Sequence, residues 1–122
     1  DVGYVDEDGY VFIVDRKKDM VISGGENIYC AAVERALGMM PGLTECAAFG
    51  LPDERMGERL VAVVVANGLT EAAIIEGVAT QLARYKAPTR VVISETTLPR
   101  NALGKVDKIA LRALWPQLSG EN

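Results

Sequence analysis

The sequence contains no histidine among its 122 residues. This absence removes the side chain that most often serves as a general base near neutral pH, and it removes the commonest metal ligand. Mechanisms in which a histidine activates a serine or cysteine nucleophile are excluded as well. Any chemistry carried by this chain must therefore depend on lysine, arginine, carboxylates and backbone groups.

Cysteine is scarce, since Cys30 and Cys46 are the only two in the chain. Their separation matches neither a metal-binding spacing nor a redox motif. We therefore expect two small buried side chains in a reducing compartment, and no metal site in this chain.

Long apolar runs and an excess of positive charge are also missing. No stretch approaches the roughly 20 apolar residues of a membrane span, and the pattern of a signal peptide is not present. The net charge of -4 and the pI near 4.8 argue against general binding to nucleic acids or anionic membranes. We expect a cytoplasmic protein, and we expect residues upstream of Asp1 because aspartate does not initiate a chain.

What the sequence does contain is the pattern of one small α+β domain. Its 49% hydrophobic and 25% charged residues are ordinary for a globular protein of this length. Strand patterns, rich in β-branched and apolar residues, occur at residues 45–51, 60–67 and 90–95. The second is nearly continuous, as in a strand covered on both faces. We predict a three-stranded sheet backed by helices, preceded by a β-hairpin at residues 4–14.

Helical periodicity occurs at residues 30–38, 71–85 and 108–115. Thr70 and Asp107 stand just before two of these stretches, where a side-chain oxygen caps the first turn. Pro116 follows the last stretch, and we expect it to end that helix.

One stretch combines features that seldom occur together. A mainly basic cluster at residues 15–19 precedes an apolar run, after which Ser23-Gly24-Gly25 provides a backbone that tolerates positive φ and lacks the Cβ that would keep a ligand away. Asn27 is placed to cap the helix that follows. Two interpretations stay open from these residues alone. One is phosphate-binding charge beside a narrow channel walled by backbone; the other is a charged surface loop, an edge strand and a glycine turn.

Four motifs in the chain resemble those of adenylate-forming enzymes, in the form found in acyl-CoA synthetases. They read DVGY at residues 1–4, DRKKDMVISGGENIY at residues 15–29, RYKAP at residues 84–88 and LPRNALGK at residues 98–105. Their order and spacing match the family, and together they extend over almost the whole chain. The resemblance is to the family's small C-terminal domain. It implies that residues 1–17 are a terminal hairpin and linker of the large N-terminal domain, and that residues 18–122 are the C-terminal lid domain.

The resemblance implies roles for three charged residues near the start of the chain. Asp1 accepts hydrogen bonds from the ribose hydroxyls of the nucleotide, and Arg16 contacts AMP, a role that suits the forked guanidinium. Lys18 occupies the hinge about which the lid domain turns. Because the host sheet of the hairpin belongs to the large domain, the hairpin either lies on the small domain or pairs with a neighbouring chain to form a dimer.

The resemblance implies two further sites. By position alone Lys105 is a solvated lysine at the end of a loop, whereas the family resemblance makes it the residue that contacts the acyl carboxylate and the α-phosphate region during adenylation. Ser23, Gly24 and Gly25 line the channel for the pantetheine arm of CoA. Glu34 and Tyr85 fit either packing or a site, and we assign them to neither.

The function implied by the resemblance is that of an acyl-CoA synthetase. The intact enzyme converts a carboxylate and ATP to an acyl-adenylate and then displaces AMP with CoA, with Mg²⁺ accompanying the ATP that the N-terminal catalytic domain mainly binds. We expect this chain to be inactive alone, because it lacks the family's phosphate loop and acyl pocket. The alternatives are an adenylation domain of a peptide synthetase, which delivers its acyl group to a carrier protein, and a binding or dimerisation module without a catalytic role.

Overall fold

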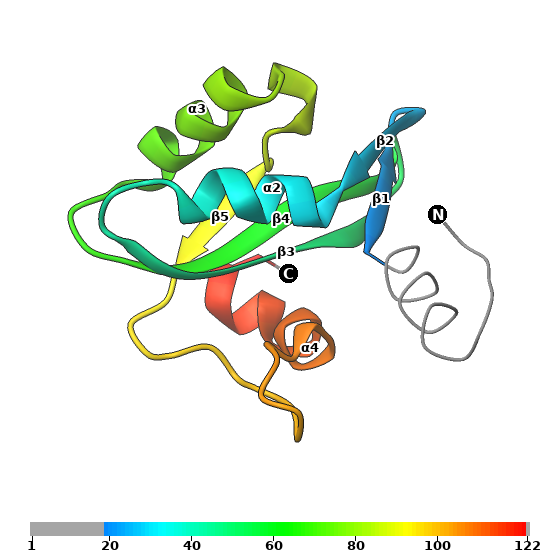
Figure 1. Ribbon diagram of the computed structural model, residues 1–122. Helices are drawn as coiled ribbons and strands as arrows, with labels where there is room; N and C mark the ends of the chain where they lie inside the picture. The colour runs from blue at the N-terminus through cyan, green and yellow to red at the C-terminus, as the bar shows by residue number, and fades with distance from the viewer. Residues whose placement is uncertain (1–18, 122) are drawn as a thin grey trace, which may run out of the picture.

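The computed structural model describes residues 19–121 of the chain. The expected hairpin at residues 4–14 and the candidate residues Asp1, Arg16 and Lys18 lie outside this range. Within it, the elements follow the order β1 (Met20–Ser23), β2 (Glu26–Tyr29), α2 (Cys30–Gly38), β3 (Leu43–Asp53), β4 (Gly57–Ala66), α3 (Glu71–Gln81), η1 (Arg84–Lys86), β5 (Arg90–Ile93) and α4 (Lys108–Ser119). The α+β class expected from the sequence is confirmed (Figure 1).

All five strands in the described part of the chain belong to one sheet that is built around β4. β3 pairs antiparallel with β4 over almost its full length. The other edge of β4 carries β1, through the pair Ser23 and Gly57, and also β5, which runs parallel to residues 61–64. The three expected strands correspond to β3, β4 and β5. The described sheet has five strands rather than three because residues 20–29 fold into a hairpin, β1–β2.

The sheet separates two hydrophobic clusters. Figure 1 shows α2 and α3 covering one face and α4 covering the other. Along β4, Leu60, Ala62 and Val64 belong to the cluster under α2 and α3, whereas Val61 and Val63 belong to the cluster over α4. This alternation is the period of two that a strand imposes on its side chains. The expectation of a strand covered on both faces is confirmed, since all five side chains are buried.

Two helix starts agree with the sequence. The side chain of Thr70 accepts a hydrogen bond from the backbone N–H of Ala73 at 3.2 Å, and α3 begins there. The carboxylate of Asp107 accepts one from the N–H of Ala110 at 3.0 Å and caps α4 in the same way. Both caps satisfy an N–H that has no partner inside its helix.

The expectation that Asn27 caps α2 is wrong. Asn27 lies in β2 opposite Ile22 of β1, and the residue at the cap position, Tyr29, makes no capping bond through its side chain. The reason is that the tight turn before it returns the chain at once into antiparallel pairing, so Asn27 belongs to a strand.

The expectation that Pro116 ends α4 is also wrong, because the helix continues to Ser119. Trp115 is buried under the sheet and Leu118 packs against the same cluster. This packing holds the last turn in place although proline removes one helical N–H. None of the helices between residues 19 and 121 is long and apolar enough to span a membrane.

Candidate functional site

The glycine turn connects β1 to β2 and consists of Gly24 and Gly25. Ser23 and Glu26 pair on either side of it, so the loop contains only two residues. The φ angles of Gly24 and Gly25 are 59° and 85°, which is the left-handed region at both positions. A two-residue hairpin loop with positive φ twice has the geometry of a type I′ turn, which matches the twist of the strands it joins.

The two glycines of this turn face different surroundings. The N–H of Gly24 donates to the carbonyl of Met56 at 2.9 Å, and a Cβ built on Gly24 would lie 2.6 Å from the terminal methyl of Met56. A Cβ on Gly25 would have no atom of the described chain within 4 Å. The turn is thus fixed to the chain before β4 on its inner side, and it presents bare backbone outward at Gly25.

The second candidate segment is the loop between β5 and α4, which carries Lys105. Asn101 organises its tip: the side-chain oxygen accepts hydrogen bonds from the N–H groups of Leu103 and Lys105, at 2.9 and 3.1 Å. The backbone of Asn101 also bonds to Lys105 and Gly104, at 2.8 and 2.9 Å. Gly104 has a φ of 83°, which glycine adopts without strain. The loop is therefore internally bonded, with Lys105 exposed at its tip.

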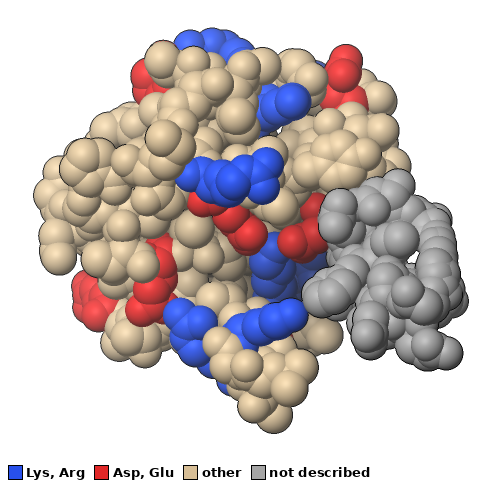
Figure 2. Space-filling model, in the orientation of Figure 1, with Lys and Arg blue, Asp and Glu red and all other residues tan. Residues whose placement is uncertain are grey.

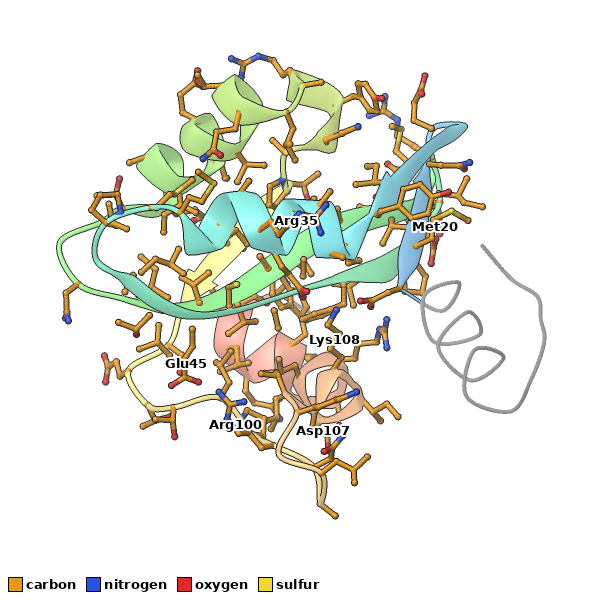
Figure 3. All side chains as sticks on the ribbon, in the orientation of Figure 1. Met20, Arg35, Glu45, Arg100, Asp107 and Lys108 are labelled. Atoms are coloured by element: carbon orange, nitrogen blue, oxygen red, sulfur yellow. The ribbon has the colours of Figure 1, made fainter. Side chains whose placement is uncertain are left out.

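The base of this loop is bound to β3. Arg100 donates through one nitrogen to the carbonyl of Gly104 at 3.0 Å, and a second nitrogen lies 3.3 Å from a carboxylate oxygen of Glu45. The same oxygen accepts from the N–H of Leu98 at 3.1 Å. Figure 3 shows Glu45 and Arg100 facing each other below the sheet. A loop held in this way presents its lysine from a fixed base.

The glycine turn and the Lys105 loop lie at opposite ends of the domain. The turn is the tip of the β1–β2 hairpin, at the end away from α2, while the loop projects from the face covered by α4 (Figure 1). The chain therefore does not bring Lys105 together with Ser23, Gly24 and Gly25.

A third cluster was not anticipated from the sequence. The ammonium of Lys108, the first residue of α4, lies 2.8 Å from a carboxylate oxygen of Asp19 and 2.9 Å from one of Glu34. The same oxygen of Glu34 accepts the N–H of Ala48 at 2.8 Å. Glu34, left unassigned above, is thus occupied in binding β3 and α4. No local pattern could have revealed this cluster, because 89 positions separate Lys108 from Asp19.

The charges of this cluster stabilise one another. Burial by itself lowers the pKa of Lys108, but the carboxylates of Glu34 and Asp19 outweigh that effect and raise the pKa above its usual value. Lys108 is therefore a permanent cation. Figure 2 shows acidic and basic side chains gathered in the middle of this face, between the upper helices and α4.

The two cysteines lie beside this cluster and are free thiols. Burial raises the pKa of Cys30 to about 12 and that of Cys46 to about 11. Cys30 is buried as expected, whereas Cys46 is half-buried and donates weakly to the carbonyl of Glu34 at 3.6 Å. Between residues 19 and 121, no three of the His, Cys, Asp and Glu side chains form a group that could hold a metal ion.

Comparison with known proteins gives consistent matches. Residues 32–105 match the family described as the AMP-binding enzyme C-terminal domain. The long-chain-fatty-acid–CoA ligase FadD13 of Mycobacterium tuberculosis is 49% identical over 114 residues, which are 92% of this chain and 22% of the relative. The 2-succinylbenzoate–CoA ligase of Bacillus cereus is 43% identical over 119 residues, which are 97% of this chain and 24% of that enzyme.

Solved structures agree with these relatives. A structure described as Mycobacterium tuberculosis fatty acyl CoA synthetase has a TM-score of 0.76 at 46% identity, covering 82% of this chain and 20% of that one. The chain thus spans less than a quarter of the length of the relatives and the structure it matches.

Proposed function

The chain belongs to the family of AMP-binding enzyme C-terminal domains, and from that premise we propose that it is the lid domain of an AMP-forming acyl-CoA synthetase. The intact enzyme, meaning a longer protein in which this domain follows a large catalytic domain, activates a carboxylate with ATP and transfers the acyl group to CoA. Residues 1–17 then belong to the large domain and residues 18–122 to the lid. The relatives are named as CoA ligases, and this favours CoA over a carrier protein as acceptor.

The observation that carries this proposal is the placement of two motifs at opposite ends of one domain (Figure 1). A two-step reaction at one site needs two different sets of groups, and a lid that turns can supply them in succession. Lys105 serves the first step and the glycine turn serves the second. Lid motions of this kind also exclude water from a reactive acyl-adenylate.

In the first step, Lys105 acts on developing charge. Its long cationic side chain stands on an internally bonded loop, so it can reach a carboxylate or α-phosphate oxygen from a fixed base. A positive charge placed where negative charge develops in the transition state accelerates a reaction by about 10²–10³. Asp1 and Arg16 contribute contacts to the ribose and phosphate of AMP in this proposal. ATP and its Mg²⁺ are held mainly by the large domain.

In the second step, the glycine turn forms one wall of the channel for the pantetheine arm. A Cβ placed on Gly25 would meet no described atom within 4 Å, so the bare backbone there leaves room for a thin chain to pass. The domain turns about Lys18 between the two steps. The acyl substrate is selected by the large domain, since the relatives that share this lid carry names as different as fatty acid and 2-succinylbenzoate ligases.

The test compares the intact enzyme with the 122-residue chain. Given ATP, Mg²⁺ and a panel of carboxylates, the intact enzyme is expected to exchange pyrophosphate with ATP and accumulate acyl-adenylate, and to form a thioester once CoA is added. A pantetheinyl carrier protein replaces CoA in a parallel reaction and is expected to accept little. The isolated chain is expected to give no exchange. Exchange by the purified chain, or an intact protein that activates no carboxylate, contradicts the proposal.

A further inference from the structure

The ion cluster of Lys108 connects parts of the chain that are far apart in sequence. Its ammonium is the shared partner of Asp19, just before β1, and of Glu34 on α2, at 2.8 and 2.9 Å. The side chain of Lys108 is 20% exposed, so the contact is largely shielded from water. Figure 3 places Lys108 at the start of α4, directly below the sheet.

Both acidic residues are themselves bound to neighbouring elements. The carbonyl of Asp19 accepts the N–H of Cys30 at 2.9 Å, which binds the start of β1 to the start of α2. Glu34 accepts the N–H of Ala48 on β3 at 2.8 Å. The cation of Lys108 is therefore the point at which α4 is bound to β1, α2 and β3 together.

The positions of Asp19 and Lys108 along the chain indicate what the cluster does. Asp19 directly follows Lys18, the proposed pivot, and Lys108 lies three positions after Lys105. We propose that Lys108 is a positioning residue, which transmits the orientation set at the pivot to the loop that carries Lys105. This inference rests on the proposed function, and it adds to it a residue that neither touches substrate nor belongs to the loop.

The glycine turn is held in place by contacts that do not involve Lys108. It is held through the pair Ser23 and Gly57, and through the bond from Gly24 to Met56. Those contacts lie within β1 and the start of β4, on the pivot side of the domain. Loss of Lys108 therefore removes the ion pairs of α4 with Asp19 and Glu34, although buried Leu111 and Trp115 still hold the helix on the sheet, and it leaves the glycine turn attached to β4. The adenylation step is expected to suffer and the thioester step is not.

The experiment uses the intact enzyme and measures each half-reaction in a single turnover. Lys108→Met is expected to lower the rate of adenylation by roughly 10- to 100-fold, as a misplaced catalytic group does, while thioester formation from supplied acyl-adenylate stays within about threefold. Lys108→Arg, which keeps a cation able to reach both carboxylates, is expected to recover most of the adenylation rate. Arg35→Met removes an exposed cation of α2 that lies outside the four motifs and is the control.

A second variant separates positioning from stability. Lys108→Met alone leaves two carboxylates facing each other, so part of its effect is loss of stability. The triple variant Lys108→Met/Asp19→Asn/Glu34→Gln removes all three charges and is expected to regain most of the lost stability. Its adenylation rate is expected to remain low, because the bond across the cluster is still missing.

The outcomes distinguish this inference from the function on which it rests. A triple variant that is stable, slow in adenylation and normal in thioester formation supports the positioning role. Recovery of adenylation along with stability, or equal loss in both half-reactions, overturns it while leaving the proposed function intact. A wild-type enzyme that forms no acyl-adenylate overturns both.

Discussion

Three glycines with similar backbone angles allow a matched test of the glycine turn and the Lys105 loop. Gly25 in the turn, Gly104 in the Lys105 loop and Gly68 between β4 and α3 have φ angles of 85°, 83° and 76°, and a Cβ on any of them would meet no described atom within 4 Å. Alanine at each position therefore suffers the same left-handed strain, about 1–2 kcal/mol. About 0.4–1 kcal/mol of this is offset because alanine also restricts the unfolded chain. Each variant is therefore expected to lose roughly 0–1.6 kcal/mol of stability, by a similar amount at all three positions.

The three variants are expected to differ in the half-reaction they damage. A methyl group in a closely fitted channel costs about 1–3 kcal/mol, so Gly25→Ala is expected to slow thioester formation roughly 5- to 150-fold and to leave adenylation unchanged. Gly104→Ala displaces the loop and is expected to slow adenylation by about tenfold or more. Gly68→Ala, remote from both segments, is expected to change neither rate.

The assays are urea unfolding of the 122-residue chain and single-turnover measurement of each half-reaction in the intact enzyme. Gly68→Ala controls for strain and stability, since its backbone angle and open surroundings match those of the other two positions. A wild-type rate of thioester formation in Gly25→Ala would refute the role of the glycine turn in that step. Equal slowing of that step in Gly68→Ala and Gly25→Ala would refute it as well.

Two further predictions concern the pivot and the thiols. Lys18→Pro fixes φ at about -65° and moves Lys17 away from the helical region. The intact variant is expected to form acyl-adenylate, whereas its thioester synthesis is expected to collapse. A normal rate of thioester synthesis would place the pivot elsewhere. The pKa values of Cys30 and Cys46 are raised to about 12 and about 11. At about pH 8 both thiols are therefore expected to react with iodoacetamide at least roughly 10²-fold more slowly than in the urea-unfolded chain. Equal rates would show that the two thiols are not buried. Because both pKa values are raised, the thiols leave stability unchanged below their ordinary value of 9.0 and reduce it as the pH rises above that value. A urea midpoint that falls between about pH 8 and about pH 10, and falls less in Cys30→Ala/Cys46→Ala, checks this sign.

Local patterns were sufficient to predict most elements of this fold. The β-branched run in β4 marked a strand buried on both faces, and Thr70 and Asp107 marked the starts of two helices through a capping bond that depends only on nearby residues. The same local logic failed at Asn27, because a cap and a strand compete for that residue and the two-residue turn before it decided in favour of the strand. It failed at Pro116 because packing of the neighbouring Trp115 outweighed one missing N–H.

In the candidate sites, too, features set by neighbouring residues could be predicted, and features that depend on distant partners could not. The free backbone expected at Ser23-Gly24-Gly25 is present as two left-handed glycines, and this followed from residue type alone. The loop around Lys105 could be located from its motif, but its attachment to Glu45 on β3 depends on a partner more than fifty positions away. The Lys108 cluster could not be predicted, since its three charged residues meet only through the tertiary fold.

The central claim is that one domain supplies Lys105 to the first half-reaction only, and Lys105→Ala in the intact enzyme tests it most directly. Single-turnover adenylation is expected to fall by about 10²–10³, while thioester formation from supplied acyl-adenylate proceeds at the wild-type rate, and the control Arg35→Ala is expected to be unchanged in both. Equal loss in the two half-reactions, or no loss in adenylation, would contradict it.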